Sequence, residues 1–251
     1  MIRLVSRALP AVLLATGILA GSGAPVGAWS EAAMCNTQWT TFATKPSVST
    51  ARAVGQCEIH RRLEDLSSLS TAAADDATLT SADRSTISHT ISRSRTGLKS
   101  LDSQLAKDAT VSTLGPDLDA ITNDYRVYVL VIRQSWLAGA TDGELAAVAA
   151  LKAADVKLGA AIDLAKSAGY DTSAAAVDLA AMNADTASAS ALIHGLDTKV
   201  LALTPSEYNA GTAGPVMDSA GQSLATAYAS LESARAQAQA TADALRALAN
   251  Q

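Results

Sequence analysis

Hydrophobic and small residues recur every three or four positions along several long stretches of this 251-residue chain. Side chains spaced in this way share one face of an α-helix, and a mean spacing of about 3.5 residues is typical of left-handed bundles and coiled coils. The pattern predicts an all-α fold, an elongated antiparallel bundle of four to five long Ala-rich helices. The residues of these seams are Ile87, Ile91, Leu98, Leu101 and Leu105; Leu179, Met182, Thr186, Ala189, Ile193, Leu196, Val200 and Leu203; and Leu224, Ala227, Leu231, Ala234, Ala238, Thr241, Leu245 and Leu248.

Alanine is frequent in the seams, and aromatic residues make up only 4 % of the chain. Small side chains let helix axes approach closely, but each of them buries little apolar area. Stability must therefore come from long helices that pack closely rather than from a few bulky anchors.

Capping residues and helix breakers predict where the helices begin and end. Thr80 and Thr204 are expected N-caps, the latter followed by proline and a glutamate at the third helical position. Gly115-Pro116 is an expected break, and Gly169 and Gly211 are expected to end or interrupt helices. These signals predict a short N-terminal segment at 29–46 and long helices at about 49–74, 82–108, 117–167, 173–201 and 205–249.

One stretch, residues 125–132, is rich in β-branched and aromatic residues and has no helical stripe. A strand would need pairing partners, and the sequence offers no second clear strand. We interpret the stretch as a helix buried on most sides, with a strand as the alternative. Residues 139–143, which begin and end with glycine, are a candidate hinge.

The first residues, 1–28, have the features of a secretory signal peptide. Arg3 and Arg7 precede an apolar run, and small residues lead to a cleavage site after Ala28. The apolar run is shorter than the roughly 18–20 residues that span a bilayer, so we expect cleavage by the general secretory route. The mature chain, 29–251, is then a single helical-bundle domain with no membrane span, secreted or held in the cell envelope.

Charge and cysteine content limit the partners of the mature chain. Without Arg3 and Arg7, 17 basic residues remain against 24 acidic ones, a net charge of −7 that disfavours nucleic acid as a partner. Cys35 and Cys57 are an even pair in an exported protein and are expected to form a disulfide. The alternative is a metal site made by Cys35, Cys57 and His60, but it lacks the second close ligand pair of a zinc site.

Catalytic motifs are not found in the sequence. The three histidines, His60, His89 and His194, lie outside known metal or triad spacings, and no nucleophile elbow, phosphate loop or dinucleotide motif occurs. We therefore expect no enzyme activity, no metal and no cofactor.

The best candidate site is an aromatic and basic group within 125–136, because the chain is otherwise so poor in aromatic residues. Tyr, Trp and Arg are the residue types enriched at binding hot spots. The alternative is that the rings fill a wide layer of an alanine-rich bundle. The residues are Tyr125, Arg126, Tyr128, Arg133 and Trp136.

These features suggest a structural or protein-interaction role, with an unknown protein or envelope component as the partner. The alternative function is a small-ligand or sensory binding module with its site around Tyr125–Trp136. The sequence does not determine the oligomeric state.

Four segments also resemble a set of exported, uncharacterised helical proteins of high-GC Gram-positive bacteria. The most specific of them are Tyr-Arg-Val-Tyr at 125–128 and Leu-Thr-Pro at 203–205, and the others begin at His60 and Leu79. Proline often follows the Tyr-Arg-Val-Tyr stretch in that set, where this chain has Arg133. The resemblance implies export and helicity, and it brings no known activity.

Overall fold

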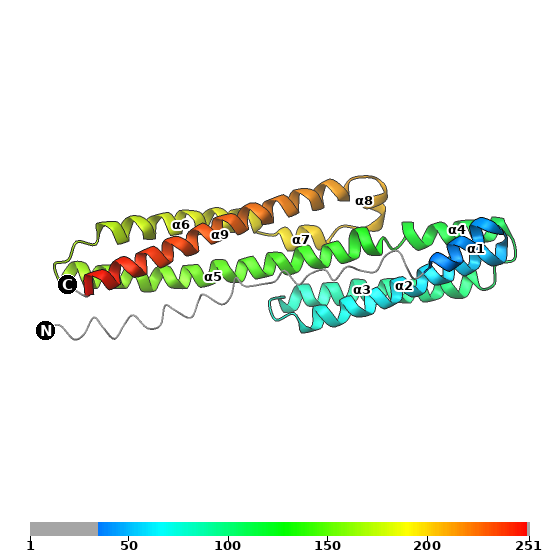
Figure 1. Cartoon of the computed structure of the whole chain (residues 1–251), viewed down its shortest axis with the longest axis horizontal. Helices are drawn as coiled ribbons and strands as arrows, with labels where there is room; N and C mark the ends of the chain where they lie inside the picture. The colour runs from blue at the N-terminus through cyan, green and yellow to red at the C-terminus, as the bar shows by residue number, and fades with distance from the viewer. Residues whose placement is uncertain (1–34, 250–251) are drawn as a thin grey trace. The chain divides into compact units, whose positions relative to one another are not determined.

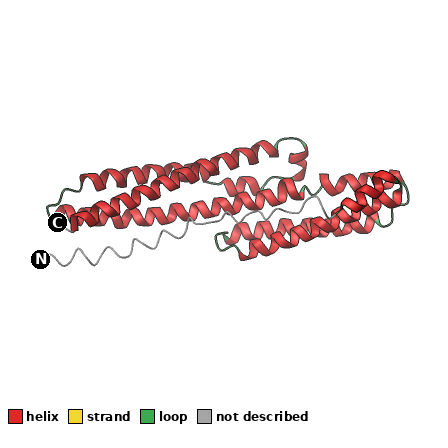
Figure 2. Cartoon of the chain, in the orientation of Figure 1, coloured by secondary structure: helices red, strands yellow, loops and turns green. Residues whose placement is uncertain are grey.

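The computed structural model describes residues 35–249, so the predicted signal peptide lies outside the described part. All regular structure in that part is helical, which confirms the predicted all-α class (Figure 2). The elements, labelled in Figure 1 where space permits, are α1 (Asn36–Thr44), α2 (Val48–Asp75), α3 (Ser81–Leu105), α4 (Val111–Asn123), η3 (Val127–Val131), α5 (Ile132–Ser167), α6 (Ser173–Ile193), α7 (Leu196–Leu201), α8 (Pro205–Asn209) and α9 (Ala213–Ala249).

The described residues form two compact units, where the sequence predicts a single domain. The three-helix unit contains 140–196 and the part of α9 from Ala220 onward. The N-terminal unit contains, of the described residues, 35–139 together with 197–219. The long seams do not reveal this division, because α5 and α9 each continue through a boundary without a break in their helical pattern.

The three-helix unit is held together by the predicted seams of α6 and α9, packed with α5. Leu158 of α5 is buried with them, and Asn183 of α6 donates a hydrogen bond to Asp155 of α5 at 2.7 Å. Alanines occupy many of the buried positions, as the sequence predicts for close packing. The buried residues of α6 and α9 in this unit include Met182, Thr186, Ala189, Ile193, Leu224, Ala227, Leu231, Ala234, Thr241 and Leu245.

Glu144 of α5 gives the three-helix unit a pH-dependent stability. Burial raises the pKa of its carboxyl to about 7, and its Oε2 atom is buried without a hydrogen bond. The folded state therefore holds this proton more tightly than the unfolded state does, and stability falls as the pH rises from about 4.5 to 7.

We expect Glu144→Gln to raise the free energy of unfolding at pH 8 by about 1 kcal/mol, a figure reduced for the partial exposure of the carboxyl. The gain should vanish below pH 4.5, where both states are protonated. Thermal unfolding measured from pH 4 to pH 8 checks this, with Glu64→Gln at an exposed position of α2 as the control. A gain that is independent of pH would contradict the assignment.

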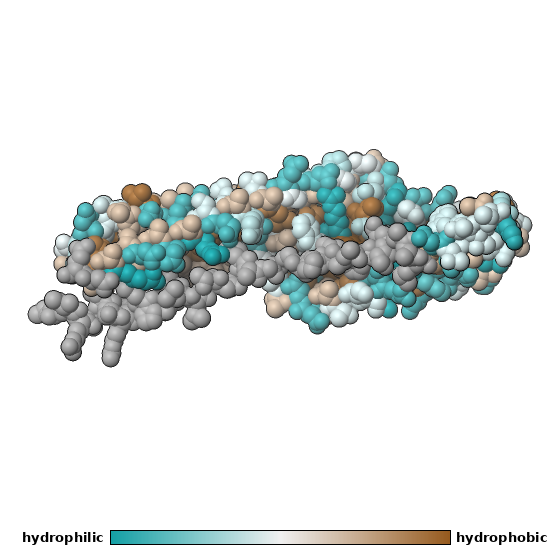
Figure 3. Space-filling model, viewed as in Figure 1, coloured by the Kyte–Doolittle hydropathy of each residue, from teal (hydrophilic) through white to brown (hydrophobic). Residues whose placement is uncertain are grey.

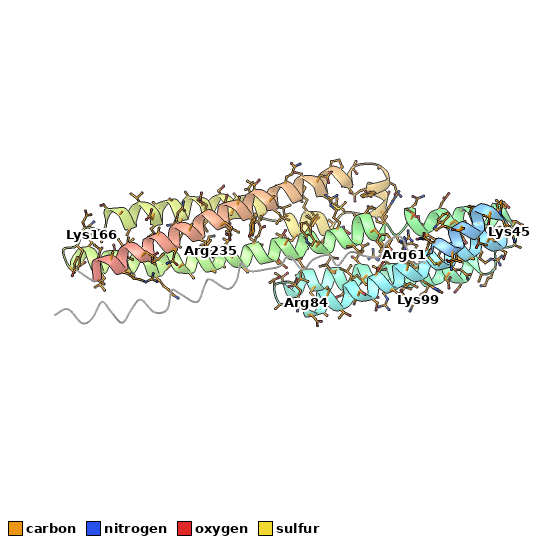
Figure 4. The ribbon with its side chains drawn as sticks, viewed as in Figure 1. Lys45, Arg61, Arg84, Lys99, Lys166 and Arg235 are labelled. Carbon is orange, nitrogen blue, oxygen red and sulfur yellow. A yellow bond between two sulfur atoms is a disulfide. The ribbon has the colours of Figure 1, made fainter. Side chains whose placement is uncertain are left out.

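The N-terminal unit is built on the antiparallel pair α2 and α3. The predicted seam of α3 is buried against Ile59 and Leu66 of α2, both fully buried. Thr80 caps α3 by accepting a hydrogen bond from the backbone N–H of Asp83, as predicted. Arg84, labelled in Figure 4, donates from the first turn of α3 to backbone carbonyls at the end of α2 and in the turn. The two helices are therefore fixed at this end by side-chain to backbone bonds.

A disulfide joins Cys35 to Cys57 and holds α1 against α2, which confirms the predicted pairing. The Cα atoms of the two cysteines lie 5.8 Å apart. No residue of α1 itself is buried, but the Nε1–H of Trp39 donates to Glu58 of α2 at 3.2 Å. Neither thiol is free for the alternative metal site.

The region between α3 and α5 differs from the sequence prediction. Gly115-Pro116 does not break a helix, because both residues lie inside α4. This helix begins after the N-cap Thr110, whose side chain accepts a hydrogen bond from the backbone N–H of Thr113, and it continues past the proline. The single helix predicted at 117–167 is three elements, α4, η3 and α5, and the break between the first two lies at Asp124–Arg126.

The later helices also divide more finely than predicted. The helix expected at 173–201 is interrupted at Gly195, which has a φ of 70° and separates α6 from α7. The helix expected at 205–249 is interrupted at Gly211, with a φ of 79°, as its glycine predicts. Thr204 and Glu207 form the predicted capping box of α8. The candidate hinge at 139–143 is helical throughout, inside α5.

Candidate functional site

The β-rich stretch of the sequence is a turn of π-helix, η3, which runs directly into α5. The helical interpretation is therefore confirmed from Val127 onward and the strand alternative is wrong, while Tyr125 and Arg126 lie before the helix. Val127, Leu130 and Val131 are buried, but Val129 is exposed. A π-turn places one more residue in the turn than an α-turn does, and such turns are frequent at functional sites. It also explains why the stretch has no helical stripe.

Arg126 precedes the π-turn with a left-handed backbone, at a φ of 42°. A non-glycine residue adopts this conformation at an energetic cost, so the surrounding contacts must hold it. Its Nε donates to Oδ1 of Asn209 at 2.6 Å, and its Nη2 donates to Oδ1 of Asn123 at 3.0 Å. The guanidinium also lies over the ring of Tyr208, 5.3 Å from the ring centre. Arg126 therefore fixes α8 to the start of η3.

Tyr128 points to α2. Its hydroxyl donates to Oδ2 of Asp65 at 2.7 Å, and the guanidinium carbons of Arg61 and Arg62 lie 4.9 and 5.2 Å from its ring centre. Arg61 is labelled in Figure 4. Burial and the hydrogen bond to Asp65 raise the pKa of the tyrosine well above its usual value. Tyr128 is thus a packing residue between η3 and α2.

The same arginines bind Glu58, one turn earlier on α2. Their Nη2 and Nη1 atoms lie 2.7 and 2.6 Å from its Oε2. Burial alone would raise the pKa of Glu58, but the hydrogen bonds from Arg62 and Trp39 and the charges of Arg61 and Arg62 lower it overall. The network therefore continues from the disulfide-bonded α1 to the π-turn.

We expect Tyr128→Phe to lower the free energy of unfolding by about 1 kcal/mol, because the ring stays between the arginines while the bond to Asp65 is lost. The raised pKa adds stability below the ordinary tyrosine pKa of about 10, and this is lost as the pH rises through the folded value. Urea unfolding at pH 7 and at pH 10.5 checks both points. Tyr228→Phe, at a tyrosine 48 % exposed on α9, is the control and should have little effect.

Tyr125 turns to α3 and lies against Gly97. A Cβ atom at position 97 would come within 2.4 Å of the hydroxyl and of Cε1 of this tyrosine. Only glycine lets the ring approach the helix so closely. Burial and the nearby charge of Asp124 raise the pKa of the phenol.

Arg133 and Trp136 lie on the first turns of α5, on a face that they share with Val129. Nη2 of Arg133 is 2.6 Å from Oδ1 of Asp218 on α9. The Trp136 residue is 49 % exposed and Val129 is 39 % exposed. The three are spaced four and three residues apart, so they form one exposed surface, which we call the Trp136 face.

A cleft of about 770 Å³ lies in the N-terminal unit between α3, the η3–α5 segment and the α7–α8 connection. Tyr125 lines one part of it. His89 and Arg93 line it from α3, and Ser94 and Gln134 are deeply buried members of its lining. Gln134 donates from Nε2 to the carbonyls of Val200 and Leu203, which fixes the α7–α8 connection.

The structure therefore does not gather the five predicted residues into one site. Tyr128 packs on α2, Arg126 holds α8, Tyr125 lines the cleft, and only Arg133 and Trp136 belong to one exposed surface. Sequence reasoning missed the other residues of the cleft, because they come from three separate segments, of which the first and last are more than 100 residues apart. His89 is exposed, and no pattern in the sequence links it to the cleft.

Among residues 35–249, none of the helices combines the length and the apolar character needed to cross a bilayer. No protein-family model matches the chain, and neither a curated protein nor a solved structure matches it. Its function is therefore proposed from the geometry of its own residues.

Proposed function

We propose that the protein is an exported, non-catalytic interaction protein that binds a protein or an envelope component through the Trp136 face. The observation that carries this proposal is the exposure of Trp136, which is 49 % accessible on a regular helix rather than in the core. Trp and Arg are the side chains that most often dominate binding energy, because each can bury a large or hydrogen-bonding surface in a partner.

The arrangement around Trp136 supports a binding role. Asp218 positions the guanidinium of Arg133, so less side-chain freedom would be lost on binding. Val129 adds an exposed apolar side chain on the same face. Figure 3 shows hydrophilic residues over much of the visible surface and strongly hydrophobic ones in small patches. Trp39 of α1 is as exposed as Trp136, but its indole N–H donates to Glu58 of α2.

Export is part of the proposal. The Cys35–Cys57 disulfide supports it, because disulfides form and persist in oxidising compartments. The predicted signal peptide would provide the route. Edman sequencing of the protein secreted by its host checks both, and a mature chain that starts at Trp29 is the expected result.

We expect Trp136→Ala to change the free energy of unfolding by less than about 1 kcal/mol, because half of the side chain is already in water. The same change should abolish retention of envelope components in a pull-down with the purified mature protein. Tyr228→Ala is the matched control, since Tyr228 is equally exposed on another helix. A loss of stability of about 3 kcal/mol, or equal retention by the two variants, would contradict the proposal.

A second candidate function, a small-ligand binding module, is favoured by the cleft beside Tyr125. Its volume lies within the roughly 300–1,000 Å³ of small-molecule sites. The candidate site is then the cleft itself rather than the whole Tyr125–Trp136 segment.

A further inference from the structure

The lining of the cleft includes two polar side chains that are almost fully buried. Ser94 is 7 % exposed and Gln134 is 3 % exposed. Both hydrogen bonds that Nε2 of Gln134 donates go to backbone carbonyls, so neither of its N–H groups is left for a ligand. Among residues 35–249, no protein group forms a hydrogen bond with Oε1 of Gln134 or with the hydroxyl of Ser94. Neither oxygen is among the described polar atoms that are sealed from solvent without a partner, so both are reached from the cleft and offer an acceptor and a hydroxyl to a ligand.

The α3 side of the cleft carries a positive charge. Nη2 of Arg93 donates to Nε2 of His89 at 2.8 Å, one helical turn earlier. Among the described residues no carboxylate forms an ion pair with Arg93, although five other arginines have such partners. Arg93 thus retains donors for an anionic group, and His89 restricts its position.

The remaining walls are suited to a small polar molecule with an apolar face. Leu130, Val131 and Leu201 line the cleft together with Tyr125. Asp124 lines it as well, and it disfavours a ligand with more than one negative group near the tyrosine. A single carboxylate at the Arg93 end and hydroxyls elsewhere satisfy all of these groups.

We propose that this cleft binds a small polyhydroxylated monocarboxylate, such as a sugar acid. The carboxylate pairs with Arg93, a hydroxyl of the ligand donates to Oε1 of Gln134, and Ser94 bonds a further hydroxyl. The inference rests on the second candidate function, small-ligand binding, and adds the class of ligand to it.

Calorimetric titration of the purified mature protein with D-glucuronate and with D-glucose tests the proposal. The two probes have the same ring, and only glucuronate carries a carboxylate. We expect glucuronate to bind at least about tenfold more tightly, as one charge-assisted hydrogen bond allows. Arg93→Met should remove this preference, whereas Arg95→Met, on the same helix but outside the cleft lining, should keep it.

Ser94→Ala is a second variant, and it should lower the affinity for both sugars by about threefold because one neutral hydrogen bond is lost. Equal affinity for the two sugars, with sensitivity to Ser94→Ala, would overturn the anionic ligand class and leave the small-ligand function in place. Failure of both sugars to bind at millimolar concentrations would overturn both. Loss of the glucuronate preference in Arg95→Met would place the carboxylate elsewhere and overturn the assignment to Arg93.

Discussion

Replacing Cys35 and Cys57 together by serine is expected to lower the free energy of unfolding of the N-terminal unit by about 3 kcal/mol. The two cysteines are 22 residues apart, and a cross-link that closes a loop of this size restricts the unfolded chain by about that amount. The disulfide also holds α1 against α2 in the folded state. Helix α1 has no buried residue of its own, so without the disulfide it is held by the hydrogen bond from Trp39 to Glu58 and by the partly buried Phe42, which packs against the core.

Urea unfolding of the oxidised protein and of the double serine variant measures this effect. The wild-type protein treated with a reductant is the control, and it should unfold at the same urea concentration as the variant. The variant itself should be insensitive to the reductant. An unchanged midpoint after removal of the bond would mean that the packing of α1 and α2 alone supplies the stability of this end.

Gly55→Leu is expected to cost about 3 kcal/mol, because glycine at this position lets α2 approach two neighbouring helices. A Cβ atom there would lie 2.5 Å from Cδ2 of Leu118 on α4 and 3.2 Å from Cδ1 of Leu105 on α3. Leu105 is fully buried and cannot move without disturbing the core. A whole leucine side chain at position 55 must therefore separate the helices.

Gly221→Leu is the matched control for this substitution. Gly221 is also a helical glycine, in α9, but apart from its chain neighbours and the adjacent helix backbone no heavy atom lies within 4 Å of the Cβ that it would gain. Leucine there should stabilise the protein by up to about 0.8 kcal/mol, because glycine is a poor helix former. Opposite signs for the two variants in thermal unfolding support the close approach at Gly55, and stabilisation by both would contradict it.

The helices were predictable because their cause is local. The seams of α3, α6 and α9 are buried as their spacing predicts, and the caps at Thr80 and Thr204 form as expected. A cap needs only a side chain and a backbone N–H three residues later, so the sequence contains the whole interaction.

The break before η3 could not be predicted because its cause is distant in the sequence. Arg126 adopts a positive φ without being glycine, and Asn209, 83 residues later, holds it there. At Pro116 the error was the opposite, because the sequence predicted a helix break that does not occur. A strong local breaker was outweighed by a helix start at Thr110, and the proline costs α4 only one backbone bond.

The candidate site was likewise predictable only where its cause is local in the sequence. Sequence composition identified the aromatic segment correctly as unusual, but it could not show that Tyr128 faces α2 while Trp136 faces water. Nor could it bring Gln134 to the carbonyls of Val200 and Leu203, since that contact depends on how α7 folds back on α5.

The alanine seams of the three-helix unit also determine which inherited changes the protein can tolerate. An alanine codon is one nucleotide away from valine, threonine, proline, aspartate and glutamate, and all of these add atoms or charge. At Ala189, Ala227 and Ala234, which are completely buried, each such change would force helices apart or bury a polar group. In a leucine-rich core, common substitutions remove atoms and leave voids. Here the harmful mutations are those that add several atoms or a charge, so the interior positions of this unit should drift mainly to glycine or to serine, which adds a single atom.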